Sequence, residues 1–196
     1  MFASDAEGWW AHFSSVAVIR DISFVAVCVF SIWPNTHHGI RRGDIWVYSP
    51  LKQVGVAGSD LVPFHKLSQW LTLSLLEPLE SMGIQFTEMP LLTGLAEYRN
   101  GGLFVDMGVL TLKNEERKDI LYDVGSELVV EWRALTVQLL DLLTEKIRAL
   151  AGLTVDELPL TKVLQGGTWA AGRQIAAQKR PGGTPPINIR SDGSVF

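Results

Sequence analysis

The clearest pattern of apolar and polar positions runs from Glu127 to Leu150. Polar side chains recur there at helical spacing along one narrow stripe, and nearly every other position is apolar. Ser126, just before this stretch, is a good N-cap residue because its hydroxyl can accept a hydrogen bond from a free helix N–H. The pattern predicts a long helix that is buried on about three sides.

A second helix is predicted from Leu61 to Met82. Asp60 can cap its first turn, and Pro63 suits a position where the backbone N–H has no helical partner. Pro78 lies inside the same stretch, and a proline removes one backbone hydrogen bond from a helix. We therefore expect this helix to be kinked or split near its end.

The C-terminal third of the chain predicts two helices and a hairpin. A short helix is expected at Leu160–Leu164, and Gly166-Gly167 then separate it from a helix over Thr168–Arg180. Residues 187–189 and 195–196 are expected to pair as a small hairpin, because a Ser-Asp-Gly turn lies between them.

Strand signals are weaker and shorter. The segment Leu103–Leu112 reads as a short strand, with Gly108 as a bulge, and residues 1–30 carry a strand-like run rich in Val, Ile and Phe. Taken together, the elements predict a mainly helical domain with a few short strands.

Composition is that of one globular domain. The chain has 196 residues, of which 47% are hydrophobic and 19% charged, and its formal net charge is −4. Lys and Arg are scattered, which argues against a nucleic-acid groove. Cys28 is the only cysteine, so no disulfide within the chain and no cysteine-based zinc site can form.

The sequence also predicts where the protein works. The longest apolar run, Ile22–Trp33, is shorter than the roughly 20 residues that a membrane-spanning helix needs. The first residues include Asp5 and Glu7 and no early Lys or Arg, which is a poor signal peptide. We expect a cytoplasmic protein without membrane or nucleic-acid partners, and the sequence leaves its oligomeric state open.

Arg133 and Asp106 break the apolar pattern around them. Arg133 lies about 120° from the polar stripe of the long helix, at roughly 100° per residue, so its guanidinium must be paired. Two interpretations are open for Arg133: a salt bridge to a core carboxylate, or a binding site for a phosphate or carboxylate. Asp106 stands among apolar residues and is either a cap, the partner of Arg133, or a catalytic or ligand-binding carboxylate.

Two further segments carry candidate chemistry. Glu97, Tyr98, Arg99 and Asn100 form a dense polar cluster before a glycine pair, which is either a solvated turn or a ligand loop. His65 and Lys66 fall in the first turn of a predicted helix, where free N–H groups favour an anion.

Two other motifs give weak evidence for a binding site. The adjacent pair His37-His38 has no carboxylate cluster nearby, so we expect no metal site. Gly166-Gly167-Thr168 opens a predicted helix but lacks the lysine and the spacing of known phosphate loops. We also expect no cofactor.

Several blocks of the sequence resemble the C-terminal half of the uracil catabolism protein four family, catalogued as a domain of unknown function. The resemblance covers Ile32 to Phe196 in order, which divides the chain into an atypical segment over residues 1–31 and a family part over residues 32–196. Members of that family are longer, and their N-terminal helical half has no counterpart here. The matching blocks are LVPFHKLSQWLTLSLLEPLE, LTGLAEYRNGGLFVDMGVL, VGSELVVEWRALTVQLLDLL, LPLTKVLQGGTWAAGR and SDGSVF.

The resemblance implies a place in pyrimidine catabolism, where uracil is degraded by ring opening through a ribosylated urea. A reaction that fits is hydrolysis of the C–N glycosidic bond of such a compound, with or without a phosphate. The FHKLSQ and AEYRN blocks are also similar to queuosine-salvage nucleoside hydrolases, a helical family distantly related in shape to DNA glycosylases. That similarity implies that Glu97 is the catalytic carboxylate.

The implied site combines an acid pair with cations and aromatic groups. Glu97 would stabilise the sugar cation at the anomeric carbon, and Asp106 would act as a second acid or base or would orient the substrate. The alternative is a non-catalytic metabolite-binding protein, or a truncated and inactive family member. The residues expected to bind the ribosyl substrate are His65, Lys66, Trp70, Tyr98, Arg99, Asn100 and Arg133, with Lys66, Arg99 and Arg133 as the phosphate ligands.

Overall fold

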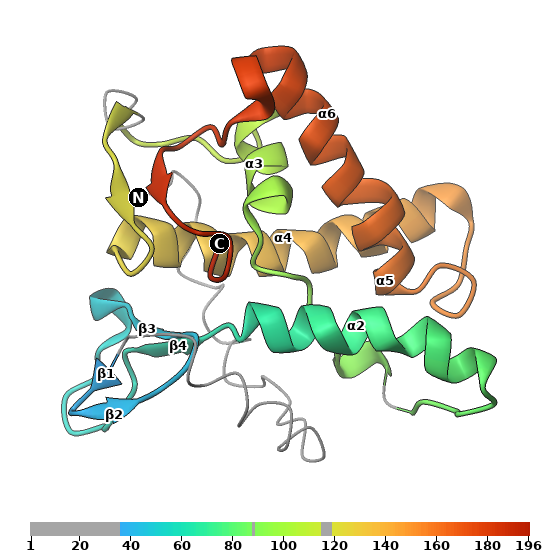
Figure 1. The fold of residues 1–196 in the computed structure, drawn as a ribbon, viewed down its shortest axis with the longest axis horizontal. Coiled ribbons are helices and arrows are strands. Elements are labelled where there is room, and N and C mark those ends of the chain that lie inside the picture. Colours follow the sequence, from blue (N-terminus) through green and yellow to red (C-terminus); the bar gives the residue numbers. More distant parts are fainter. Residues whose placement is uncertain (1–35, 88, 115–118) are drawn as a thin grey trace.

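A long central helix organises the fold. The computed structural model describes residues 36–87, 89–114 and 119–196, so the expectations for residues 1–30 and for Cys28 lie outside the described residues. Helix α4 (Glu127–Ala151) runs through the middle of the molecule, with α2 on one side and α3 and α6 on the other (Figure 1). The other main helices are α2 (Lys66–Ser81), α3 (Tyr98–Asp106), α5 (Leu160–Lys162) and α6 (Ala170–Lys179).

The strands are short and form three separate pairs. Two pairs are antiparallel and one is parallel, and together they hold few residues, so the fold is mainly helical as predicted. The antiparallel pairs are β1 (Thr36–His37) with β2 (Ile40–Arg41) and β3 (Ile45–Val47) with β4 (Leu61–Pro63); the parallel pair is β5 (Tyr122–Asp123) with β6 (Ile189–Arg190).

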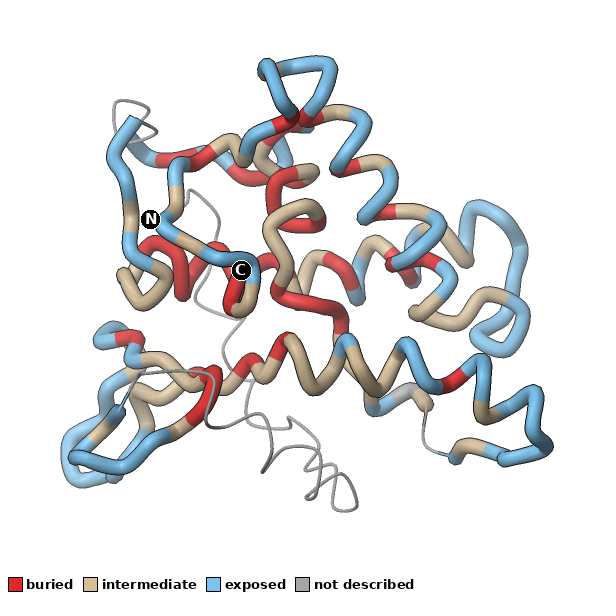
Figure 2. Tube along the Cα trace, in the orientation of Figure 1, coloured by how far each residue is buried: buried red, intermediate tan, exposed pale blue. Residues whose placement is uncertain are grey.

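The core lies along α4, as its apolar pattern predicts. Trp132 and Leu140 on this helix are 0% exposed, and the C-terminal Phe196 is 1% exposed. The rings of Trp132 and Phe196 meet edge to face with centroids 4.7 Å apart. The buried parts of the tube in Figure 2 accordingly gather on α4, on α3 and on the end of the chain. The C-terminal segment is thus part of the core.

The prediction of a strand over Leu103–Leu112 is wrong, because α3 continues to Asp106. Two effects override the strand-like pattern. Glu97 caps the helix with its carboxylate, and Gly101 lets the neighbouring helix approach closely: a Cβ there would lie 2.5 Å from Oγ1 of Thr136. Packing on α4 therefore decides this segment more than its own propensity does.

The start of α2 also differs from the prediction. Leu61–Pro63 pairs with Ile45–Val47 as strand β4, so the helix begins at Lys66 rather than at Leu61. Pro78 does not split the helix, which runs to Ser81. The residue before the helix, His65, has a left-handed backbone with φ of 51°, an uncommon conformation for a residue other than glycine.

Two further predictions fail in the C-terminal third. The expected break at Gly166-Gly167 is absent, because Val163–Trp169 forms a π-helical segment that joins α5 to α6. The expected hairpin is also wrong, since Ile189–Arg190 pairs in parallel with Tyr122–Asp123 instead. Long-range pairing of this kind leaves no signal in the local sequence pattern.

Two further expectations concern a membrane-spanning helix and the likeness to DNA glycosylases. Within residues 36–87, 89–114 and 119–196, no helix has the length and apolar character needed to cross a bilayer. The distant likeness to DNA glycosylases stays a prediction.

Candidate functional site

Arg133 and Asp44 form a buried ion pair at the centre of the candidate site. Nη1 and Nη2 of Arg133 donate to the two carboxylate oxygens of Asp44 over 2.7 and 2.8 Å, and both side chains are 0% exposed. Nη2 also donates to the carbonyl of Val195, and the guanidinium lies 4.0 Å from the ring centroid of Phe64. Arg133 therefore joins α4 to β3, β4 and the C-terminal segment.

This pair resolves the two interpretations of Arg133. The salt-bridge interpretation is right, but the partner is Asp44 and not Asp106. Both terminal nitrogens of Arg133 bind protein groups and its side chain is 0% exposed, so the structure gives no support to its expected role as a phosphate ligand, which stays a prediction.

Asp44 in turn fixes the beginning of α2. Its carboxylate accepts a hydrogen bond of 3.0 Å from the backbone N–H of Lys66 and one of 2.7 Å from the indole of Trp46. Burial by itself raises the pKa of Asp44. The hydrogen bonds and charge of Arg133, together with the hydrogen bonds from the Lys66 backbone and the Trp46 indole, hold that pKa below its ordinary value. Asp44 therefore stays ionised and anchors Lys66.

Lys66 is a buried cation, 6% exposed, beside the C-terminal segment. Its Nζ donates to the carbonyl oxygen of Gly193 over 2.6 Å. Burial lowers the pKa of the Lys66 ammonium, while the carboxylates of Glu97 and Asp44 raise it and the charge of Arg133 lowers it. An ammonium has three N–H donors, and among the described residues one of them is used, so two are left for a ligand or water.

Glu97 lies half-buried at the N-terminus of α3 and interacts electrostatically with Lys66. Its Oε2 accepts from the backbone N–H groups of Arg99 and Asn100 over 2.8 and 3.3 Å. Among the described residues, no donor hydrogen-bonds to Oε1 and no direct ion pair joins Glu97 to Lys66. Each group therefore retains the capacity to bind a third partner.

The environment changes the acidity of Glu97. Burial raises its pKa, and the helix N–H groups, the Lys66 ammonium and Arg99 oppose that change without cancelling it. A carboxyl whose pKa is raised toward neutrality suits proton transfer as well as stabilisation of a nearby positive charge. We call Lys66, Glu97 and the groups that position them, Asp44 and Arg133, the Lys66–Glu97 cluster.

His65 precedes Lys66 and lies half-buried near the same ion pair. Burial lowers the pKa of its imidazole; the Asp44 carboxylate opposes this change and the Arg133 guanidinium adds to it. The imidazole is therefore neutral at neutral pH. His65 therefore lies within electrostatic range of Asp44 and Arg133, and Lys66 lies within electrostatic range of Glu97.

Asp106 lies at the other end of α3, away from Glu97. Nine residues separate the two carboxylates, which is about 13 Å along a helix that rises about 1.5 Å per residue. Glycosidase carboxyl pairs lie only about 5 to 9.5 Å apart. Asp106 and Glu97 are therefore not positioned to act on one glycosidic bond.

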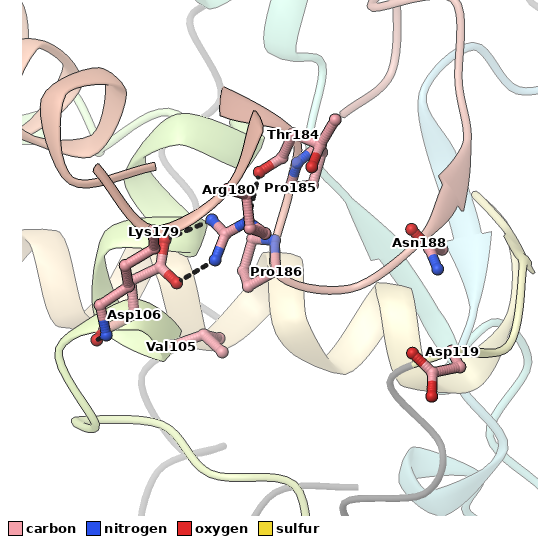
Figure 3. A pocket seen from close by; sticks show the side chains of 9 residues that line it. All are labelled: Val105, Asp106, Asp119, Lys179, Arg180, Thr184, Pro185, Pro186 and Asn188. Carbon is pink, nitrogen blue, oxygen red and sulfur yellow. Dashed lines mark hydrogen bonds and ion pairs between the residues drawn. The ribbon is translucent and has the colours of Figure 1, made fainter. Parts of the chain in front are cut away.

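Asp106 instead forms an ion pair with Arg180. The guanidinium of Arg180 donates to both carboxylate oxygens over 2.6 Å, and Nζ of Lys179 donates to the backbone carbonyl of Asp106. Figure 3 shows this pair in the wall of a hollow of about 530 Å³, with Asp119 and Asn188 on the opposite side. The pair ties the end of α6 to the end of α3.

The remaining predicted site residues lie around the cluster without converging on it. The amide oxygen of Asn100, which is 1% exposed, accepts from Thr168, so this side chain is structural. Trp70 is 57% exposed on α2, and it lies in neither of the two hollows found among the described residues. Arg99 lies 4.5 Å from the ring centroid of Tyr98 and donates to the carbonyl of Gly183, toward α6.

Sequence reasoning missed Asp44 and the carbonyls of Gly193 and Val195. Asp44 lies between Gly43 and an apolar strand, and an aspartate in that position is equally typical of a solvated turn. The SDGSVF block was recognised only as part of a family resemblance. Backbone carbonyls carry no sequence signal, so the bonds that hold Lys66 and Arg133 to this segment were not predictable.

Comparison with known proteins decides the family. The family described as "Protein of unknown function (DUF1688)" matches residues 11–196 of this chain. The chain belongs to this family. Protein urg3 of Schizosaccharomyces pombe is 44% identical over 170 residues, which cover 84% of this chain and 41% of that protein. Uracil catabolism protein 4 of Lachancea kluyveri is 42% identical over 192 residues, which cover 85% of this chain and 43% of that protein.

The family resemblance found in the sequence is thereby confirmed. The chain spans about two fifths of the length of these two relatives. The match to the DUF1688 family also extends to residue 11, so it includes much of the segment that looked atypical.

Proposed function

We propose that this chain acts in uracil catabolism by hydrolysing the C–N glycosidic bond of a ribosylurea, with Glu97 as the catalytic carboxylate. Its similarity to a relative named Uracil catabolism protein 4 supports the pathway. The observation that carries the chemistry is the half-buried Glu97 carboxyl, whose Oε1 accepts no hydrogen bond from any residue that the structure describes, and which lies within electrostatic range of the buried Lys66.

In this reaction water adds to the anomeric carbon, the C–N bond breaks, and the urea nitrogen takes up a proton. Positive charge develops on the sugar ring in the transition state, and a carboxylate held against one face stabilises it. Glu97 supplies that carboxylate. Its raised pKa also lets it accept a proton from the attacking water.

Lys66 orients the substrate and favours the ionised form of Glu97. Its ammonium donates to the Gly193 carbonyl, and its backbone N–H donates to Asp44. Two N–H donors remain to bind substrate oxygens. Asp106 has no part in this proposal, because it lies at the far end of α3 in its own ion pair.

The experiment measures urea released from N-ribosylurea and from its 5-phosphate. The purified chain is compared with full-length Uracil catabolism protein 4 of Lachancea kluyveri, and with the variant Glu97→Gln. Glu80→Gln, at an exposed position of α2, is the matched control. We expect Glu97→Gln to lower turnover at least about a hundredfold, the lower range for a general acid or base, and Glu80→Gln to leave it unchanged.

A second function is non-catalytic binding of a pathway intermediate. It is favoured by the fraction of each curated relative that the chain covers, 41% and 43%. In that case the ribosyl compound raises the melting temperature of the chain without releasing urea. Turnover by the full-length relative but not by this chain would support this second function and contradict the first.

A further inference from the structure

A hollow of about 450 Å³ lies between the start of α3, the length of α6 and the turn that follows α6. It is separate from the Lys66–Glu97 cluster, and its volume falls within the range of about 300 to 1,000 Å³ that is usual for small-molecule sites. Its lining includes Arg99, Trp169, Arg173, Gln174, Gly182 and Gly183.

Two guanidinium groups line this hollow, and no described carboxylate forms a salt bridge with either, although the charge of Glu97 interacts with Arg99. Arg99 is held by the Gly183 carbonyl and by the Tyr98 ring. The guanidinium of Arg173 lies 4.9 Å from the ring centroid of Trp169. The lining itself contains no Asp or Glu. The hollow is therefore positive, in a chain whose formal net charge is −4.

Unusual backbone structure brings the two arginines to the same place. The π-helical segment Val163–Trp169 ends at Trp169, on the edge of the hollow, and π-helical turns occur often at functional sites. One turn later, Gly172 lies directly against the carbonyl of Arg99, so closely that a Cβ could not be accommodated. This contact brings α6 against α3, which lie next to each other in Figure 1, and Arg173 and Arg99 accordingly line the same hollow.

Guanidinium groups bind phosphate through pairs of parallel hydrogen bonds, and their planar shape matches the phosphate oxygens. Two such groups without carboxylate partners match the charge of a phosphate monoester. Trp169 and Gln174 add an apolar face and an amide, which suit the organic part of the same molecule.

We propose that this hollow binds the phosphate group of a phosphorylated small molecule, with Arg99 and Arg173 as its ligands. The sequence predicted that Arg99 binds phosphate together with Lys66. In the structure Arg99 lines the same hollow as Arg173, and Lys66 is not part of that lining. This site does not depend on hydrolysis at Glu97. It accepts a sugar phosphate or a nucleoside monophosphate, because both present the same group.

Binding is measured by isothermal titration of the whole chain with inorganic phosphate, ribose 5-phosphate and unphosphorylated ribose, at constant ionic strength. The variant is Arg173→Gln, because Arg173 is exposed and its loss should leave the fold intact. Arg190→Gln is the matched control: the side chain of this arginine is 71% exposed, and its ion pair within the described part of the chain is with the exposed Asp123.

We expect ribose 5-phosphate to bind with a Kd of about 1 mM or lower, ribose not to bind, and Arg173→Gln to weaken binding about tenfold. Arg190→Gln should bind as the unmodified chain does. Equal binding by the two variants, or no binding of either phosphate compound, would overturn the proposal. Glu97→Gln should still bind ribose 5-phosphate. Urea release tests the proposed function and phosphate binding tests this site, so either proposal can fail without the other.

Discussion

The carboxylate of Asp44 and the guanidinium of Arg133 lie 89 residues apart in the sequence and form two parallel hydrogen bonds inside the protein. The same carboxylate holds the backbone N–H of Lys66, and the same guanidinium holds the carbonyl of Val195. One ion pair therefore connects the start of β3, the start of α2, the second turn of α4 and the C-terminal segment. The backbone position of Lys66, which interacts electrostatically with Glu97, depends on that connection.

Breaking this pair should strongly destabilise the protein. Arg133→Met leaves Asp44 charged and buried without its main partner, which should cost about 3 to 5 kcal/mol in the free energy of unfolding. The double variant with Asp44→Asn should recover part of that loss, because the uncompensated charge is removed. Urea unfolding midpoints measure both changes.

Arg190→Met is the control for the loss of an arginine, because its pair with Asp123 is exposed on both sides. It should change the free energy of unfolding by no more than about 0.5 kcal/mol. A loss of similar size in Arg133→Met would show that the buried pair adds nothing.

The lowered pKa of Asp44 predicts a specific sensitivity to acid. Because the pKa is lower in the folded protein than in the unfolded chain, the contribution of Asp44 is fully present above about pH 4, its unfolded value, and is lost as the pH falls through the folded pKa. Urea unfolding from pH 6 down to pH 3 should show this loss. The double variant Asp44→Asn, Arg133→Met should lose less stability over the same range, and parallel curves for the two proteins would contradict the assignment.

Glu97 caps α3 as well as serving the proposed reaction, and two substitutions separate these roles. Glu97→Gln keeps an oxygen that can accept from the N–H groups of Arg99 and Asn100, so the unfolding free energy should change little. Glu97→Ala removes the cap and should cost about 1 kcal/mol. Urea unfolding of both variants tests this difference, and equal stability of the two would show that the cap contributes nothing.

Close packing of α6 on α3 predicts opposite results at two glycines. Gly172→Ala places a methyl group against the carbonyl of Arg99 and should destabilise the protein by about 1 to 3 kcal/mol. Gly166→Ala meets no atom within 4 Å and should stabilise the helical segment by up to about 1 kcal/mol. Melting temperatures distinguish the two, and similar shifts in one direction would refute the packing argument.

Asp106 provides a test of where the reaction takes place. Its carboxylate pairs with Arg180 at the far end of α3. Asp106→Asn should therefore leave urea release within a few-fold of the unmodified chain, after correction for any loss of folded protein. A loss as large as that of Glu97→Gln would place the reaction between the two carboxylates, which the length of α3 argues against.

The sequence predicted the parts of the fold that local pattern controls. Helix α4 was predicted over 127–150 and spans Glu127–Ala151, because its apolar pattern is strong; Ser126 lies at the N-cap as predicted, but its hydroxyl forms no capping hydrogen bond among the described residues. Helix α3 was predicted as a strand, because its packing partners Trp132 and Thr136 lie more than 30 residues away in the sequence. Such contacts leave no trace in the local pattern.

The candidate site divides in the same way. Lys66 was found because the first turn of a helix has recognisable chemistry, whereas Glu97 was found from a polar cluster before a glycine pair and from the family resemblance, without its role as a helix cap. The need of Arg133 for a partner was also predicted, but its identity was not. Asp44 is far away in the sequence, and many carboxylates could satisfy a buried guanidinium equally well.

The role of Glu97 as the catalytic carboxylate is tested most directly by urea release from N-ribosylurea and its 5-phosphate, measured for the unmodified chain and for Glu97→Gln. The prediction is turnover by the unmodified chain and a loss of at least about a hundredfold in the variant, with an unchanged unfolding midpoint. Full turnover by Glu97→Gln, or none by the unmodified chain when full-length Uracil catabolism protein 4 of Lachancea kluyveri is active, would contradict it.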